Sequence, residues 1–108
     1  EMKKTFPLEV EGHKPARVIE MIHRDVKKYL KRERRKELPE GVDFWDFDCR
    51  VGGSIETAEV VHVSKISEAI SSAPEKEWQA IYVEILVKQG VRMKRDRPPY
   101  VAKGKGSE

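Results

Sequence analysis

The chain has 108 residues, a formal net charge of +3 at pH 7, 38% charged residues, 38% hydrophobic residues and a single cysteine. This length suits one domain with a modest core, and one cysteine excludes an internal disulfide and favours a reducing compartment. The sequence shows no apolar run long enough to cross a bilayer and no signal peptide, so we expect a cytoplasmic protein.

Residues 3–10 alternate between apolar and polar side chains, which is typical of a strand. Phe6, Leu8 and Val10 share one predicted face. Pro7 cannot donate to a sheet ladder, so we expect it at an unpaired edge or at a bulge.

A long amphipathic helix is predicted over residues 14–36. Pro15 suits the first turn of this helix, and Pro39 and Gly41 follow its end. One side of the helical wheel is apolar, with Val18, Ile19, Ile22, Val26, Tyr29 and Leu30. The opposite side is cationic, with Arg17, Arg24, Lys28, Lys31 and Arg35.

The second half of the chain predicts a strand at 42–51, a third strand at 57–63 and a strand at 79–88. A short helix is expected between the last two strands, with Ser64 as its N-cap and Pro74 as its stop. Two sets of apolar side chains are expected to face the helices: Trp45, Phe47, Cys49 and Val51, then Ile81, Val83, Ile85 and Val87.

The element order β-α-β-β-α-β predicts the α+β class. The simplest packing is a ferredoxin-like sandwich, an antiparallel sheet with two helices on one face. If the strand at 57–63 does not form, the sheet has three strands. Residues 1–88 are expected to form a single domain, and residues 89–108 a basic flexible tail, because Pro98-Pro99 and the high charge oppose a packed structure.

Several strings in the chain carry a resemblance to a known family: MKKTFPL at 2–8, KRERRK at 31–36, LPEGVDFWDFDC at 38–49 and YVEILVK at 82–88. With these strings the chain resembles a family of short bacterial proteins known as a domain of unknown function. The resemblance implies a bacterial cytoplasmic protein. It implies no activity, cofactor or catalytic residue.

Charge is strongly segregated along the chain. Residues 14–36 carry a net charge of +7 and residues 88–105 a net charge of +6, whereas residues 37–87 carry −8. Such a layout attracts an anionic polymer to one side, but it also fits a solvated helix face whose last turns complement the helix dipole.

Carboxylates and other reactive groups give weaker signals. Asp46 and Asp48 are two residues apart, so they share a strand face and could hold a hard cation. With Glu84 and Glu9 they would make the open sheet face repel phosphate. Cys49 is expected to be a buried small hydrophobe, and no cofactor is indicated. The three histidines, His13, His23 and His62, lack metal-ligand spacing.

Three hypotheses follow from this pattern. The first is a non-catalytic binding module for RNA or another polyanion, which would be contacted through Arg17, Arg24, Lys28, Lys31 and Arg35. The second is a protein–protein module or homodimer that joins the basic helix to the acidic middle. The third is a metal-assisted enzyme centred on Asp46 and Asp48.

Overall fold

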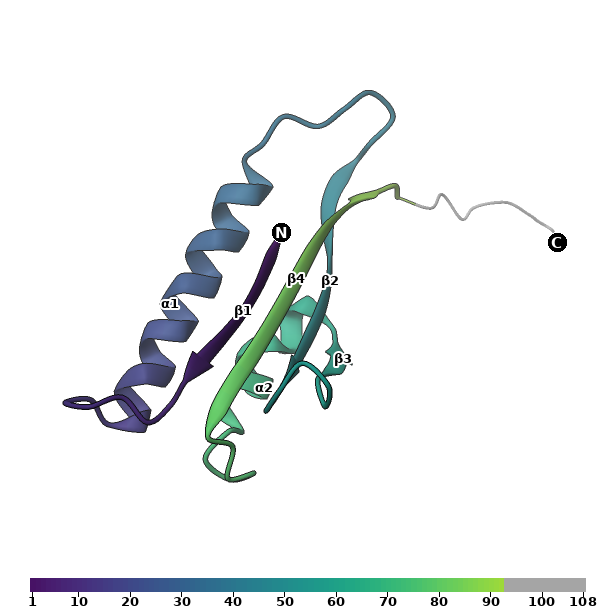
Figure 1. The fold of residues 1–108 in the computed structure, drawn as a ribbon. Coiled ribbons are helices and arrows are strands. Elements are labelled where there is room, and N and C mark those ends of the chain that lie inside the picture. The colour runs from purple at the N-terminus through teal and green to yellow at the C-terminus, as the bar shows by residue number, and fades with distance from the viewer. Residues whose placement is uncertain (93–108) are drawn as a thin grey trace, which may run out of the picture.

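The computed structural model describes residues 1–92. Within these residues the elements follow the predicted βαββαβ order, with one added 3₁₀ helix (Figure 1). Gln89 and Gly90, predicted to begin the tail, belong to the last strand, and residues 93–108 of that tail lie outside the described residues. The elements are β1 Met2–Pro7, α1 Pro15–Arg34, β2 Phe44–Gly52, β3 Glu59–Val61, η1 Val63–Lys65, α2 Ile66–Ser71 and β4 Ala80–Gly90.

The four strands form one sheet in the order β1-β4-β2-β3, and every neighbouring pair is antiparallel. The predicted α+β class is confirmed. The ferredoxin-like arrangement in particular is not confirmed, because β4 and β2 occupy the interior of the sheet, where that arrangement places its first and third strands. Figure 1 shows β4 between β1 and β2. The most apolar strand of the sequence has taken a central position, where both of its faces can be covered.

The long helix predicted from the apolar spacing is present as α1. Pro15 lies at its start, as predicted, and Arg35 follows its last residue as the C-cap. The indole Nε1 of Trp45 donates to the carbonyl oxygen of Lys36 at 2.9 Å, so the start of β2 is tied to the chain leaving the helix. The predicted apolar side is buried: Val18, Ile19, Ile22, Val26, Tyr29 and Leu30, to which the structure adds Glu33.

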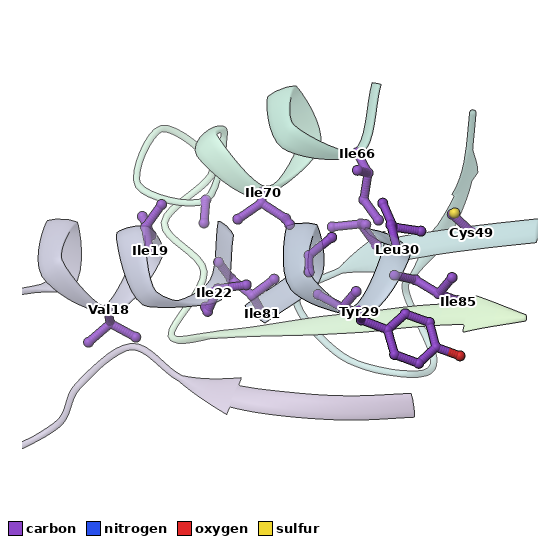
Figure 2. Close-up of a cluster of buried hydrophobic side chains, with 14 of the residues drawn as sticks. Val18, Ile19, Ile22, Tyr29, Leu30, Cys49, Ile66, Ile70, Ile81 and Ile85 are labelled. Atoms are coloured by element: carbon purple, nitrogen blue, oxygen red, sulfur yellow. The ribbon is translucent and has the colours of Figure 1, made fainter. Parts of the chain in front are cut away.

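The core lies between one face of the sheet and both helices, as predicted. Cys49 pairs with Ile85 across β2 and β4, and both side chains belong to the same cluster as the apolar sides of α1 and α2. Figure 2 shows Ile66 and Ile70 of α2 directed toward the side chains of α1. Ile70 is completely buried, and burial of a side chain of this size stabilises a fold by about 1.5–3 kcal/mol.

The third strand and the start of the second helix differ from the prediction. β3 has only three residues, with Val60 exposed and Val61 packed against the core. The predicted N-cap at Ser64 is wrong. Instead, His62 Nδ1 accepts a hydrogen bond from the backbone N–H of Ser64 at 3.1 Å, which caps η1, and α2 begins only at Ile66. A histidine ring thus takes the capping position that serine was expected to fill.

The first strand is shorter than the predicted range of 3–10. It ends at Pro7 on the edge of the sheet, a position that tolerates a residue without an N–H. Val10 was predicted to share a strand face with Phe6 and Leu8, but it lies beyond the end of β1 and is exposed, whereas Leu8 is buried. Val10 lies in a turn closed by a hydrogen bond from the N–H of His13 to its carbonyl oxygen at 3.0 Å.

Candidate anion-binding site

The basic stripe is the set of five cations predicted from the helical spacing, and all five are exposed on α1 and its C-cap. Arg17 lies close to a carboxylate, with its Nη1 3.4 Å from Oε1 of Glu20. Within residues 1–92 the other four form no ion pair. The stripe consists of Arg17, Arg24, Lys28, Lys31 and Arg35.

The acidic residues of α1 leave most of the stripe uncompensated. Glu33 lies on the buried side of the helix and is only 7% exposed. Its carboxylate contacts Lys36 at 3.0 Å and Arg32 at 3.8 Å, and neither of these cations belongs to the stripe. The solvent-facing side of the helix therefore presents several positive charges that have no internal counterion among the described residues.

A groove of about 770 Å³ lies between α1 and the segment made of η1 and α2, and we call it the interhelical groove. Three cations from α1, Arg24, Lys27 and Arg34, line one wall. Lys27 and Arg34 are seven residues apart, close to two helical turns, so they project on the same side of α1. The guanidinium of Arg34 also lies 5.3 Å from the centre of the Phe47 ring, which holds it against the fold.

Three serine residues, Ser64, Ser67 and Ser71, line the opposite wall of the groove. Ser71 Oγ lies 3.0 Å from Nε2 of His23, a contact that joins α2 to α1 directly. Ser64 Oγ lies 2.8 Å from Nδ1 of His62. Ser67 is exposed, and within the described part of the chain its hydroxyl has no side-chain hydrogen bond.

The floor of the interhelical groove is apolar but largely covered. Val26, Leu30 and Ile66 line it and are 4%, 7% and 3% exposed. Half-buried Val63 and the carbon atoms of the other side chains make much of the accessible lining apolar. The polar groups that a ligand would meet there are ammonium, guanidinium, imidazole and hydroxyl groups, which suit an anion with hydrogen-bond acceptors.

Sequence reasoning found the basic stripe but missed the groove beside it. Lys27 and Arg34 lie beside the apolar side of the helical wheel and outside the basic stripe. Their seven-residue spacing therefore did not indicate a second row of cations. The spacing of Ser64, Ser67 and Ser71 also repeats on one side of a helix. Neither pattern gives a site alone, since the site requires α2 to lie beside α1.

Asp46 and Asp48, the candidate cation ligands, share the open face of the sheet as predicted. Lys88 on β4 reaches both, with Nζ 2.8 Å from Asp48 Oδ1 and 3.9 Å from Asp46 Oδ2. The hydrogen bond to Asp48 raises the pKa of the Lys88 ammonium, which keeps it charged. An ammonium already lies between the carboxylates, and residues 1–92 contain no cluster of three potential metal ligands.

The remaining acid on this face, Glu84, is paired with Arg50 at 3.2 Å. Glu9 lies beyond the end of β1 and does not join them. Lys88 and Arg50 pair with the three carboxylates of this face, so its repulsion of phosphate is weaker than the carboxylates alone would produce.

Cys49 is the other group with potential chemistry, and it is buried as predicted, with 1% exposure. Burial, with a smaller contribution from Asp48, raises the pKa of its thiol to about 11. A nucleophilic cysteine needs the thiolate, so this side chain is an inert part of the core.

The fold and site together define a small α+β domain with a cationic helix and a basic groove beside it. Comparison with protein families identifies the chain further: it belongs to a family of unknown function (DUF6172), whose model matches residues 2–96. No curated protein and no solved structure matches the chain. The prediction that the chain belongs to a family of unknown function is confirmed, and this family assigns no activity.

Proposed function

We propose that this protein is a non-catalytic binding module for RNA or another polyanion, which it contacts through the basic stripe of α1. One observation carries the proposal: four of the five cations in the stripe have no carboxylate partner within residues 1–92, although they share one side of α1 and its C-cap. Exposed like charges on one face create a field that favours an anionic partner.

The dimensions of the stripe suit a chain of phosphates. Arg24 and Arg35 are eleven residues apart, which corresponds to about 16 Å along a helix axis. Lysine and arginine on an exposed helix bind mainly backbone phosphate, and this gives affinity without sequence specificity. Four phosphate contacts would give a slope of about −3 to −4 when log K is plotted against log salt concentration.

The other two hypotheses receive less support from the contacts of the sheet face. A metal-assisted centre at Asp46 and Asp48 would have to displace Lys88. In a homodimer the basic stripe of one copy would contact the acidic middle of the other. The sheet carboxylates of that middle segment already form ion pairs within the molecule, so they are less available to a second copy. A stripe in which four of five cations lack a counterion within residues 1–92 favours the polyanion.

A binding titration against structured RNA at several salt concentrations tests the proposal. Lys28→Glu/Lys31→Glu should abolish most of the affinity and leave the melting temperature unchanged, because both side chains are exposed and unpaired in residues 1–92. Lys65→Glu/Lys76→Glu is the matched control, since it changes the net charge equally but lies off α1. Failure of the unmodified protein to bind RNA at low salt would contradict the proposal.

The cellular setting of this module remains a prediction from the sequence, namely a cytoplasmic protein of bacterial origin. In the part of the chain that the structure describes, none of the helices combines the length and the apolar character needed to span a membrane. The RNA titration does not depend on this setting, because it uses the purified protein.

A further inference from the structure

The interhelical groove offers a ligand two different walls. One wall carries the cations Arg24, Lys27 and Arg34, and the other carries serine hydroxyls, including that of Ser67, which makes no side-chain hydrogen bond within residues 1–92. A phosphodiester presents one negative charge and several acceptor oxygens, so it can pair with the cationic wall and accept a hydrogen bond from the hydroxyl wall. An anion that rests only on the outer surface of α1 cannot reach the hydroxyl wall.

The width of the groove limits what can enter it. His23 and Ser71 are in direct contact across it at 3.0 Å, so α1 and α2 are packed neighbours. The axes of packed helices lie about 8–10 Å apart. A single nucleic-acid strand can lie along such a groove, whereas an A-form RNA duplex, in which two strands wind around a common axis, would rest on the rims.

The length and lining of the groove indicate which part of a strand it would contact. Arg24 and Arg34 are ten residues apart, about 15 Å along the helix axis, which leaves room for more than one phosphate. Among the described residues that line the groove there is no Phe, Tyr or Trp, so it lacks the stacking platforms that hold bases in many single-strand sites. The contact would therefore be to the sugar–phosphate backbone, with the bases directed outward.

We propose that the interhelical groove binds the backbone of a single RNA strand, so that the protein prefers single-stranded to double-stranded RNA. This inference rests on the proposed function and adds the form of the nucleic acid and the surface that selects it. The basic stripe supplies charge to either form. The groove, with Lys27, Arg34 and Ser67, supplies the preference.

The test compares one labelled, unstructured oligoribonucleotide alone and annealed to its complement, by fluorescence anisotropy at fixed salt. Lys27→Gln/Arg34→Gln changes the groove, and Lys28→Gln/Arg35→Gln is the matched control. Each pair removes one lysine and one arginine that are seven residues apart, on α1 or at its C-cap. The groove pair should lower single-strand affinity by about tenfold more than duplex affinity, equivalent to about 1.4 kcal/mol. The control pair should lower both affinities equally.

Ser67→Ala provides a second test that does not alter charge or the contact of Arg34 with Phe47. Loss of one hydroxyl donor to a phosphate should weaken single-strand binding about three- to tenfold, with no effect on the duplex and no change in salt slope. Equal affinity for both RNA forms, or equal effects of the two double variants, would overturn this inference and leave the proposed function standing. Absence of binding to either form would overturn both.

Discussion

Arg50 on β2 and Glu84 on β4 face each other across the two central strands and form an ion pair of 3.2 Å. Glu84 also accepts a hydrogen bond from the hydroxyl of Tyr82 at 2.8 Å. The other Nη of Arg50 donates to the carbonyl oxygens of Ile55 and Ala58, at 3.1 and 3.2 Å. One guanidinium therefore joins the centre of the sheet to the loop that leads into β3.

Replacement of Glu84 should destabilise the fold through this network. Glu84→Gln removes the negative charge beside a partly buried guanidinium, so we expect the free energy of unfolding to fall by about 1–3 kcal/mol. Urea denaturation measures the change. Glu59→Gln on the neighbouring edge strand is the control, because its side chain is exposed. Equal stability of the two variants would show that the network contributes nothing.

Alkaline pH should destabilise the protein through Cys49. In the unfolded chain the thiol ionises near its ordinary pKa of 9.0, whereas in the fold its pKa is about 11. Between these values the folded state holds a proton that the unfolded state has lost, so stability falls as pH rises and is fully present below pH 9. We expect a loss of about 1 kcal/mol between pH 8 and pH 10.

Chemical denaturation at several pH values checks this dependence, with Cys49→Ala as the control. The alanine variant has a different absolute stability, because a buried atom is lost. Its stability should fall less steeply over this pH window, and the remaining loss comes from Tyr29 and Tyr82, whose pKa values are also raised in the fold, Tyr29 by burial and Tyr82 by its hydrogen bond to Glu84. If the variant and the unmodified protein lost stability in parallel, another group would be responsible for the dependence.

Removal of Lys88 should expose a latent cation site. In Lys88→Gln the carboxylates of Asp46 and Asp48 lose the ammonium between them, and two carboxylates on one strand face can bind a hard cation weakly. Calorimetric titration with Mg²⁺ should give measurable heat for this variant and none for the unmodified protein. Lys65→Gln, a distant exposed lysine, should behave as the unmodified protein. Tight Mg²⁺ binding without any substitution would revive the metal-centred hypothesis.

Glu20 is expected to restrain RNA binding, because it pairs with Arg17 at 3.4 Å. Glu20→Gln frees this member of the basic stripe for phosphate, so RNA affinity at low salt should rise about twofold or more and the salt slope should steepen by up to about 1. Anisotropy titrations at several salt concentrations measure both quantities. Glu75→Gln makes the same charge change outside α1 and should leave the slope unaltered, and an identical response of the two variants would assign the effect to net charge alone.

The elements that local patterns could predict are those with a long, regular signal. α1 has six apolar side chains on one side and a proline in its first turn, and both features hold in the structure. The alternation in β2 and β4 also correctly predicted which side chains of these strands face the helices. The start of α2 was not, because serine is a common N-cap while the capping here depends on the geometry of the His62 ring.

The strand order was predicted less well than the strands themselves. The sequence separates β1 from β4 by more than seventy residues, and nothing local records that they pair with Thr5 opposite Tyr82. Pairing of distant strands is decided by which faces must be covered together. The ion pairs of the sheet face were missed for the same reason, since Lys88 and Arg50 pair with acids that lie far from them in the chain.

The sequence by itself determined the two-sided character of α1, because helical periodicity places each side chain on a known side without reference to any partner. It thereby determined the basic stripe. Only the tertiary structure decided that α2 lies against α1 and that a groove with a cationic and a hydroxyl wall runs between them. The physical reason is that a groove belongs to two elements at once, and their packing follows from burying a shared core that no single segment encodes.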